Sequence, residues 1–118
     1  MPFSILGRNA MLDAYGTLAV FASLHDAIPG ENGANEFSGG SPAYARKAIS
    51  WNPAADGNKD ASNQPVFDVP AGKTVAHIGF WTAEEGGVWK GSAPLVNEVF
   101  AAQGKYTLLN MGIGIQNA

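Results

Sequence analysis

Two histidines are the side chains in this sequence that are best suited to acid–base or metal chemistry. His25 and His77 stand far apart in the chain, and the sequence contains no cysteine. A protein zinc site needs at least three side-chain ligands, and neither histidine has further ligands at a recognisable spacing. We therefore predict that both are structural or surface histidines, and we assign no metal ligand between them.

A short acidic segment resembles the first half of a calcium-binding loop. Asp56, Asn58 and Asp60 would place oxygen ligands at positions one, three and five of such a loop. The second half departs from the pattern, because Ala61 replaces the glycine of the sharp bend and Phe67 replaces the bidentate glutamate. The segment is therefore predicted to be a polar turn built on its Asp-Gly pair, with a weakly bound cation as the alternative.

No other arrangement of residues supports catalysis or a bound cofactor. The glycines at 39–40 and 112–114 are not followed by the helical pattern that a phosphate-binding loop requires. No Gly-x-Ser-x-Gly motif is present, and Glu84 and Glu85 are adjacent in a turn instead of facing each other across a cleft. The sequence therefore predicts a protein that is not an enzyme, with no catalytic, cofactor-binding or metal-binding residue.

The charge of the chain excludes some partners. Its 118 residues carry 7 Lys and Arg against 10 Asp and Glu, a net charge of −3. Nucleic acids and anionic membrane surfaces are bound by clustered basic residues, which these few cannot supply. The longest apolar stretch, residues 18–24, is shorter than the roughly 20 residues that cross a bilayer. We therefore expect neither a nucleic acid nor a membrane as a partner.

The elements that must position these residues are predicted to be mostly strands. Charged residues are only 14% of the chain, and 15 glycines and 7 prolines favour many turns over a helix bundle. Residues 4–15 have helical spacing, whereas several short segments alternate between apolar and polar residues. The strands are expected near residues 17–25, 43–51, 65–69, 74–82, 87–92 and 105–115, with a further segment at 95–101. The fold class is thus all-β: a single domain over residues 1–118, a β-sandwich or barrel of about seven short strands with one short N-terminal helix.

Two segments are candidates for contacts with other subunits. Residues 26–41 form a long loop that retains apolar side chains, so we expect a contact arm whose conformation is set by neighbouring subunits. The run 108–115 is apolar and lacks proline and charge, so it is either a docking element or an inner strand of the protein's own sheet. The predicted interaction residues are Ile28, Phe37, Tyr44, Leu109, Met111, Ile113 and Ile115.

The tryptophans leave two functions open. Trp51, Trp81 and Trp89 lie in or beside predicted strands, where large aromatic rings are more often packed in the core. Two or three such rings exposed on one face would instead form a platform for sugar rings. A carbohydrate-binding module that recognises host envelope glycans is therefore the alternative function, with a host surface glycan as its partner. Exposure of these rings discriminates between the two.

Motifs spread over residues 9–91 occur together in one known group of proteins. They are Asn9-Ala10-Met11-Leu12-Asp13-Ala14, Ala22-Ser23-Leu24-His25, Gly33-Ala34-Asn35-Glu36, residues 38–48 with Trp51, residues 65–72, Thr74-Val75 and His77-Ile78-Gly79-Phe80-Trp81. Taken in this order, they resemble a family of small phage and prophage proteins of actinobacteria that are usually labelled tail fibre or minor tail proteins. The resemblance supplies no catalytic residues.

What the resemblance implies is a non-enzymatic structural protein of the virion, made in the host cytoplasm. It would be a minor tail or tail-fibre component or a capsid decoration protein. A low-charge chain with long polar loops suits a subunit of a symmetric assembly, because its loops and strand edges can meet neighbours. The expected partners are copies of the chain itself and other virion proteins of the capsid or tail.

Overall fold

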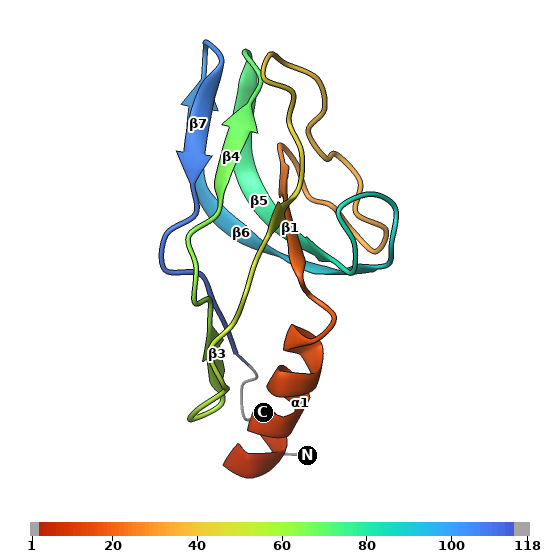
Figure 1. Ribbon diagram of the computed structural model, residues 1–118, viewed down its shortest axis with the longest axis vertical. Coiled ribbons are helices and arrows are strands. Elements are labelled where there is room, and N and C mark those ends of the chain that lie inside the picture. Colours follow the sequence, from red (N-terminus) through yellow and green to blue (C-terminus); the bar gives the residue numbers. More distant parts are fainter. Residues whose placement is uncertain (1–2, 115–118) are drawn as a thin grey trace.

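A four-stranded antiparallel sheet forms the centre of the protein (Figure 1). The computed structural model describes residues 3–114. In spatial order, the sheet contains β2 (Lys47–Ala48), β1 (Phe21–His25), β5 (Lys73–Trp81) and β6 (Trp89–Phe100). β1 pairs with β5 over its whole length, from Phe21 opposite Trp81 to His25 opposite His77. Because all of β1 except Phe21 is buried, the β1–β5 pair lies at the centre of the core.

Two small antiparallel sheets complete the β structure. β4 (Val66–Val69) pairs with β7 (Gly104–Thr107), and β3 (Asn58–Asp60) pairs with β8 (Gly112–Gly114). Phe67 of β4 is fully buried and belongs to the same core cluster as Val75 and Ile78 of β5. The β4–β7 pair therefore covers the central sheet, in front of β5 in Figure 1. The mostly β fold with one helix is confirmed, and its sheets do not close into a barrel.

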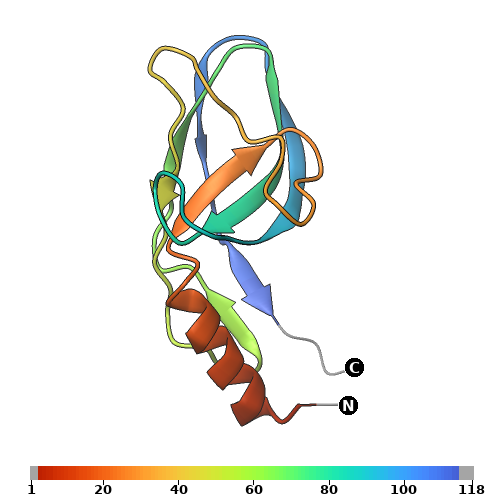
Figure 2. The ribbon, with the colours of Figure 1, turned by 90° about the vertical axis from the view of Figure 1, so that its right-hand side faces the viewer.

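The helix α1 (Ile5–Gly16) projects from one end of the β structure, beside β3 (Figure 2). Ser4 begins the helix as an N-cap, because its hydroxyl oxygen accepts a hydrogen bond of 3.0 Å from the Gly7 amide. Leu12 is the buried residue of the helix. The projection makes the molecule long for its width, with extents of 46 × 24 × 22 Å.

Polar contacts attach α1 to the segment 52–60. The Asn9 side-chain oxygen accepts a hydrogen bond of 2.9 Å from the Gly57 amide. The Asp13 carboxylate accepts one of 2.7 Å from the ammonium of Lys59, a side chain that is nearly buried. Lys59 also donates to the backbone oxygen of Asn52 at 2.9 Å. The hydrogen bond from Lys59 holds the pKa of Asp13 below its usual value, so this carboxylate remains charged near neutral pH.

Residues 55–58 form the hairpin turn that the sequence predicts. Asp56 and Gly57 both have positive φ, 53° and 77°, which is the type I′ conformation that Asp-Gly favours. Ala55 and Asn58 exchange two backbone hydrogen bonds, of 2.8 and 2.9 Å. The turn presents the Gly57 amide to α1, so a local sequence signal sets one attachment point of the helix.

Several predicted elements are confirmed with shifted ends. The helix expected at 4–15 is α1, and the strands at 65–69 and 74–82 are β4 and β5. The strand expected at 17–25 begins only at Phe21, because the amides of residues 17–19 donate back to the last turn of α1. The strand expected at 43–51 shortens to β2, because the Asn63 side chain binds the Ala48 oxygen and the Ser50 amide.

Three strand predictions are wrong in extent. The segments expected at 87–92 and 95–101 are one strand, β6, which tolerates Pro94 because it lies at the edge of the sheet. The strand expected at 105–115 is interrupted between β7 and β8, where Asn110 takes a positive φ of 53° and turns the chain. β3 is absent from the prediction, because its residues Asn-Lys-Asp show no apolar alternation.

Contacts within the chain hold the loop at 26–41. The Asp26 amide donates to the Asn35 oxygen at 3.3 Å, and the Phe37 amide donates to the Leu24 oxygen at 3.1 Å. The side chains of Pro29 and Phe37 are buried. The chain's own contacts therefore hold the loop in this structure, and the influence of neighbouring subunits on its conformation stays a prediction.

Candidate functional site

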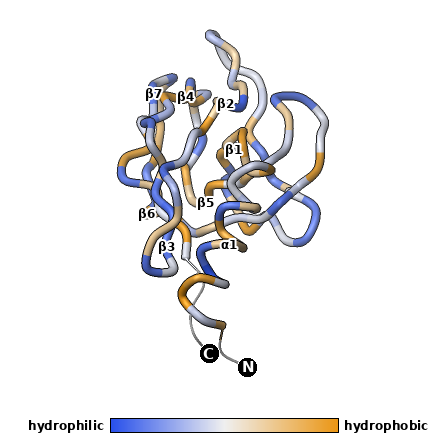
Figure 3. Tube along the Cα trace, turned by 60° about the horizontal axis from the view of Figure 1, so that its bottom comes forward, coloured by the Kyte–Doolittle hydropathy of each residue, from blue (hydrophilic) through white to orange (hydrophobic). Residues whose placement is uncertain are grey.

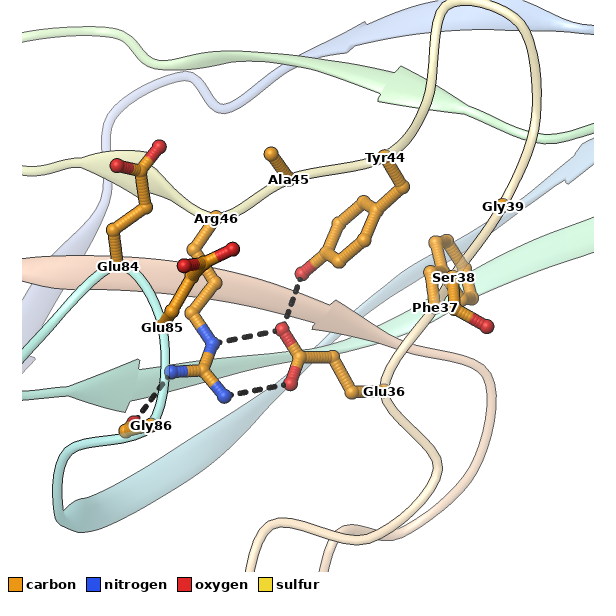
Figure 4. Close-up of a pocket in the computed structure, with 10 residues that line it drawn as sticks. All are labelled: Glu36, Phe37, Ser38, Gly39, Tyr44, Ala45, Arg46, Glu84, Glu85 and Gly86. Atoms are coloured by element: carbon orange, nitrogen blue, oxygen red, sulfur yellow. Dashed lines mark hydrogen bonds and ion pairs between the residues drawn. The ribbon is translucent and has the colours of Figure 1, made fainter.

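Arg46 occupies the centre of a polar cluster between two loops (Figure 4). Its Nε and Nη2 donate to the two carboxylate oxygens of Glu36, at 2.9 and 3.0 Å. Its Nη1 donates to the backbone oxygens of Ala83 and Gly86, and the guanidinium carbon lies 3.7 Å from the centroid of the Trp81 ring. A planar guanidinium can bind a carboxylate with two hydrogen bonds and stack on an aromatic ring at once. Arg46 therefore ties the turn before β6 to the loop that contains Glu36.

Tyr44 extends this cluster into the core. Its hydroxyl donates to Glu36 Oε2 at 2.9 Å and accepts from the Leu24 amide at 2.9 Å. Burial, and secondly the charge of Glu36, raises the pKa of Tyr44 far above its ordinary value. The phenol therefore stays protonated and acts as a fixed donor.

Ser23 and His25 form a second, fully buried chain of hydrogen bonds. His25 Nδ1 lies 2.8 Å from the backbone oxygen of Ala34, which can only accept, so Nδ1 carries the proton. Nε2 then accepts from the Ser23 hydroxyl at 2.7 Å, and that hydroxyl accepts from Trp81 Nε1 at 2.9 Å. Burial lowers the pKa of His25, which favours this neutral form. Since both side chains are 0% exposed, this serine–histidine pair meets no substrate and joins β1 to the loop instead.

A hollow of about 510 Å³ lies beside the Arg46 cluster and is lined by the residues that Figure 4 draws. Glu84 and Glu85 are exposed at this hollow, while Glu36 and Arg46 bind each other. Within residues 3–114, no group of three or more His, Cys, Asp or Glu side chains is placed to hold a metal ion. The arrangement can hold loops in place, and its charged centre is already occupied by its own partners.

The interaction residues predicted in the long loop lie in different environments. Ile28 is exposed at 74%. Phe37 is buried in the core, and Tyr44 is half-buried with its ring 5.8 Å from that of Phe37. Ile28 is thus the one of these three whose side chain is available to a partner.

The C-terminal run is partly used by the chain itself. Leu109 is exposed, Met111 is buried in the core, and Ile113 packs against the core from β8, which pairs with β3. Ile115 lies outside the described residues. The sequence predicts that this run is either a docking element or an inner strand. Met111 and Ile113 lie toward the core, as in an inner strand, whereas Leu109 faces solvent.

The three tryptophans are half-buried, and each makes contacts within the chain. Trp51 Nε1 donates to the Ala19 oxygen at 2.8 Å, and its ring lies 5.7 Å from that of Phe80. Trp89 packs edge-on against Trp81 at 5.1 Å, and the guanidinium of Arg46 stacks on the Trp81 ring. The row of exposed rings that a sugar platform requires is not formed by these three residues.

Exposed apolar side chains gather on and beside α1. Among the described residues, five of the eleven exposed large apolar side chains lie within residues 3–18. They are Phe3, Ile5, Leu6, Met11 and Leu18. Figure 3 shows hydrophobic residues at the free end of the helix. Single exposed apolar residues are ordinary, but a concentration on one projecting element is typical of an interaction surface.

A groove of about 430 Å³ lies between α1, β6 and β8. Its lining is largely apolar, and Lys90 is the charged residue in it. The lining consists of Met11, Leu12, Tyr15, Phe80, Lys90, Gly91, Ser92, Ala93, Ile113 and Gly114. Further along β6, Val96 and Val99 are exposed at 91% and 74%.

Sequence reasoning missed the charged residues that organise these sites. Arg46 binds a carboxylate ten residues earlier and carbonyls some forty residues later, so no local motif indicates it. Lys59 and Lys90 stand alone in the sequence, and only the fold shows that one attaches α1 and that the other lines the groove. The one feature of the sequence that points to these residues is the small number of basic side chains, 7 in 118 residues.

Comparison with known proteins identifies a related family. The family model described as Podophage GP4 fiber I protein gp80 matches residues 4–112. This span includes α1 and the strands β1 to β7 in full. No curated protein matches the chain. Among the described residues, no helix has the length and apolar character needed to cross a membrane.

Proposed function

The chain belongs to the family described as Podophage GP4 fiber I protein gp80, and on this premise we propose that it is a non-enzymatic structural subunit of a bacteriophage fibre. The match over residues 4–112 carries the proposal, because it covers nearly the whole described structure. Of the positions that the sequence left open, the fibre is favoured over the capsid surface, since the family is a phage fibre family.

The chemistry of the polar clusters supports a structural role. Arg46 and Glu36 satisfy each other, and Ser23 and His25 are closed to solvent. Catalysis needs a nucleophile or an acid–base group that reaches a substrate. These clusters instead hold loops against the central sheet, which suits a subunit that must keep its shape under load.

The proposed partners are other virion proteins and copies of the chain itself. The exposed apolar side chains at the free end of α1, Ile5 and Leu6, are the surface that we assign to attachment to another virion protein. Leu6 is its most exposed member at 81%, and α1 projects from the β structure, so a partner can cover it without disturbing the core.

Immunogold labelling of purified particles tests this function. An antibody against the chain should label the fibres, and label on the capsid alone or absence from particles would contradict the proposal. A second experiment supplies Leu6→Ser or Val88→Ser protein to particles that lack the chain. We expect Leu6→Ser to reduce incorporation and the control Val88→Ser, at an exposed apolar residue away from α1, to leave it unchanged.

A further inference from the structure

Lys90 differs from the other basic residues in its surroundings. Four of the seven basic residues form ion pairs within the chain: Arg46, Lys59, Lys73 and Lys105. Lys90 has no ion pair among residues 3–114, and its backbone oxygen accepts from the Tyr15 hydroxyl at 2.8 Å. The residue lines the apolar groove between α1, β6 and β8. A cation on an otherwise apolar groove selects an apolar segment that carries a carboxylate.

The same strand carries a segment with this composition. Val96, Asn97, Glu98 and Val99 are all exposed, and Glu98 has no ion pair among the described residues. The charge of Glu98 acts on Tyr106, whose pKa is raised chiefly by burial and secondly by this charge. The pairing of β5 with β6 is irregular here, since only Ala76 stands opposite residues 95–97. This bulge accounts for the exposure of the segment.

We propose that the groove of one chain receives the segment 96–99 of a second copy, with Glu98 facing Lys90. Lys90 and Glu98 each lie four residues from Pro94 on the edge strand β6. When two β6 strands run antiparallel around a twofold axis near Pro94, Lys90 of each copy stands opposite Glu98 of the other. The exchange is therefore reciprocal and closes as a dimer.

Side chains carry this contact, because β6 is a poor edge for sheet extension. Pro94 lacks an amide donor, and bulges interrupt the strand on both sides of it. The two contacts bury the valines of the segment 96–99 against the apolar lining of the groove and pair two charges that have no ion-pair partner within residues 3–114. The inference deepens the proposed structural role, on which it rests, by naming the surface that joins two copies.

A charge exchange tests the pairing. Sedimentation equilibrium of the full chain should show a species of twice 12.3 kDa. Lys90→Glu and Glu98→Lys should each weaken dimerisation by at least about tenfold, because each places like charges together. An equimolar mixture of the two variants, and the double variant, should dimerise again, since both contacts regain opposite charges.

Matched controls separate this contact from general effects. Glu84→Lys makes the same charge change at an exposed turn and should leave dimerisation unchanged. Val96→Ser should weaken it, whereas Val88→Ser, at another exposed valine, should not. A chain that is monomeric at all concentrations, an association indifferent to Lys90 and Glu98, or a species larger than a dimer would overturn the inference. Label on the fibres of particles is independent of these results, so the fibre role can stand when the dimer fails.

Discussion

Replacing Glu36 by glutamine should lower the free energy of unfolding by about 3 kcal/mol. Glu36 accepts three hydrogen bonds, from Arg46 Nε, Arg46 Nη2 and the Tyr44 hydroxyl, at 2.9, 3.0 and 2.9 Å. Glutamine keeps the shape of the side chain, but its NH₂ group replaces one acceptor oxygen, so at least one donor faces another donor. Arg46, with its side chain 11% exposed, would also lose its counter-charge. Removing one partner of a buried pair costs about 3–5 kcal/mol, and the partial exposure of Glu36 places the value at the lower end.

Thermal and guanidinium unfolding followed by circular dichroism measure this loss. A loss of 3 kcal/mol corresponds to a decrease of about 12 °C in Tm for a chain of this length. Asp68→Asn is the matched control, because its partner Lys105 is 67% exposed and such surface pairs contribute less than about 1 kcal/mol. If Glu36→Gln cost no more than Asp68→Asn, the Arg46 cluster would not hold the two loops as we describe.

Three further predictions use the same chain. Gly33→Ala should cost at least about 2 kcal/mol, because φ is 75° and a Cβ atom would lie 2.6 Å from the Trp81 ring. Gly30→Ala, with φ 68° and open space, should cost only about 1 kcal/mol in the same unfolding assay, and equal losses would contradict the ring packing. Burial lowers the pKa of His25 below 6.5. The hydrogen bond to Ala34 and the charge of Glu36 raise this pKa, whereas His77 and Arg46 lower it further, and the net shift is downward. The unfolded chain therefore binds the proton more tightly than the folded chain. The free energy of unfolding should therefore fall between pH 7.5 and 5.5, by up to about 1.4 kcal/mol per pH unit. If a His25→Gln variant showed the same slope, another titrating group would cause the pH dependence. Asp13→Ala should speed hydrogen exchange of the α1 amides but not of β1 or β5, and faster exchange throughout would show that the helix does not open separately.

Local signals were enough for the parts of the fold that depend on neighbouring residues. Ser4 caps α1 and the Asp-Gly pair makes a type I′ turn, because each conformation is decided within four residues. The turn signals on either side of residues 74–82 located β5 for the same reason, although burial on both faces of this strand leaves no alternating pattern.

Tertiary contacts decided what the sequence pattern could not show. β6 continues through Pro94 because nothing pairs with its outer edge among the described strands, which is a property of the sheet and not of the segment. β2 ends early because Asn63, which is distant in sequence, binds its backbone. The Arg46 cluster unites residues 36, 46, 83 and 86, and no spacing in the sequence connects them.

The distribution of charge divides the molecule into parts that keep its shape and parts that meet partners. The buried or partly buried pairs Arg46–Glu36 and Lys59–Asp13 join loops or α1 to the β structure. Such pairs contribute little net stability but penalise wrong arrangements, because a buried charge without its partner is costly. Among residues 3–114, Lys90 and Glu98 have no ion-pair partner, and both lie on one edge strand next to apolar surface. A contact between copies at β6 leaves Leu6 and the free end of α1 uncovered, so one small subunit can pair with its copy and still attach to a different virion protein.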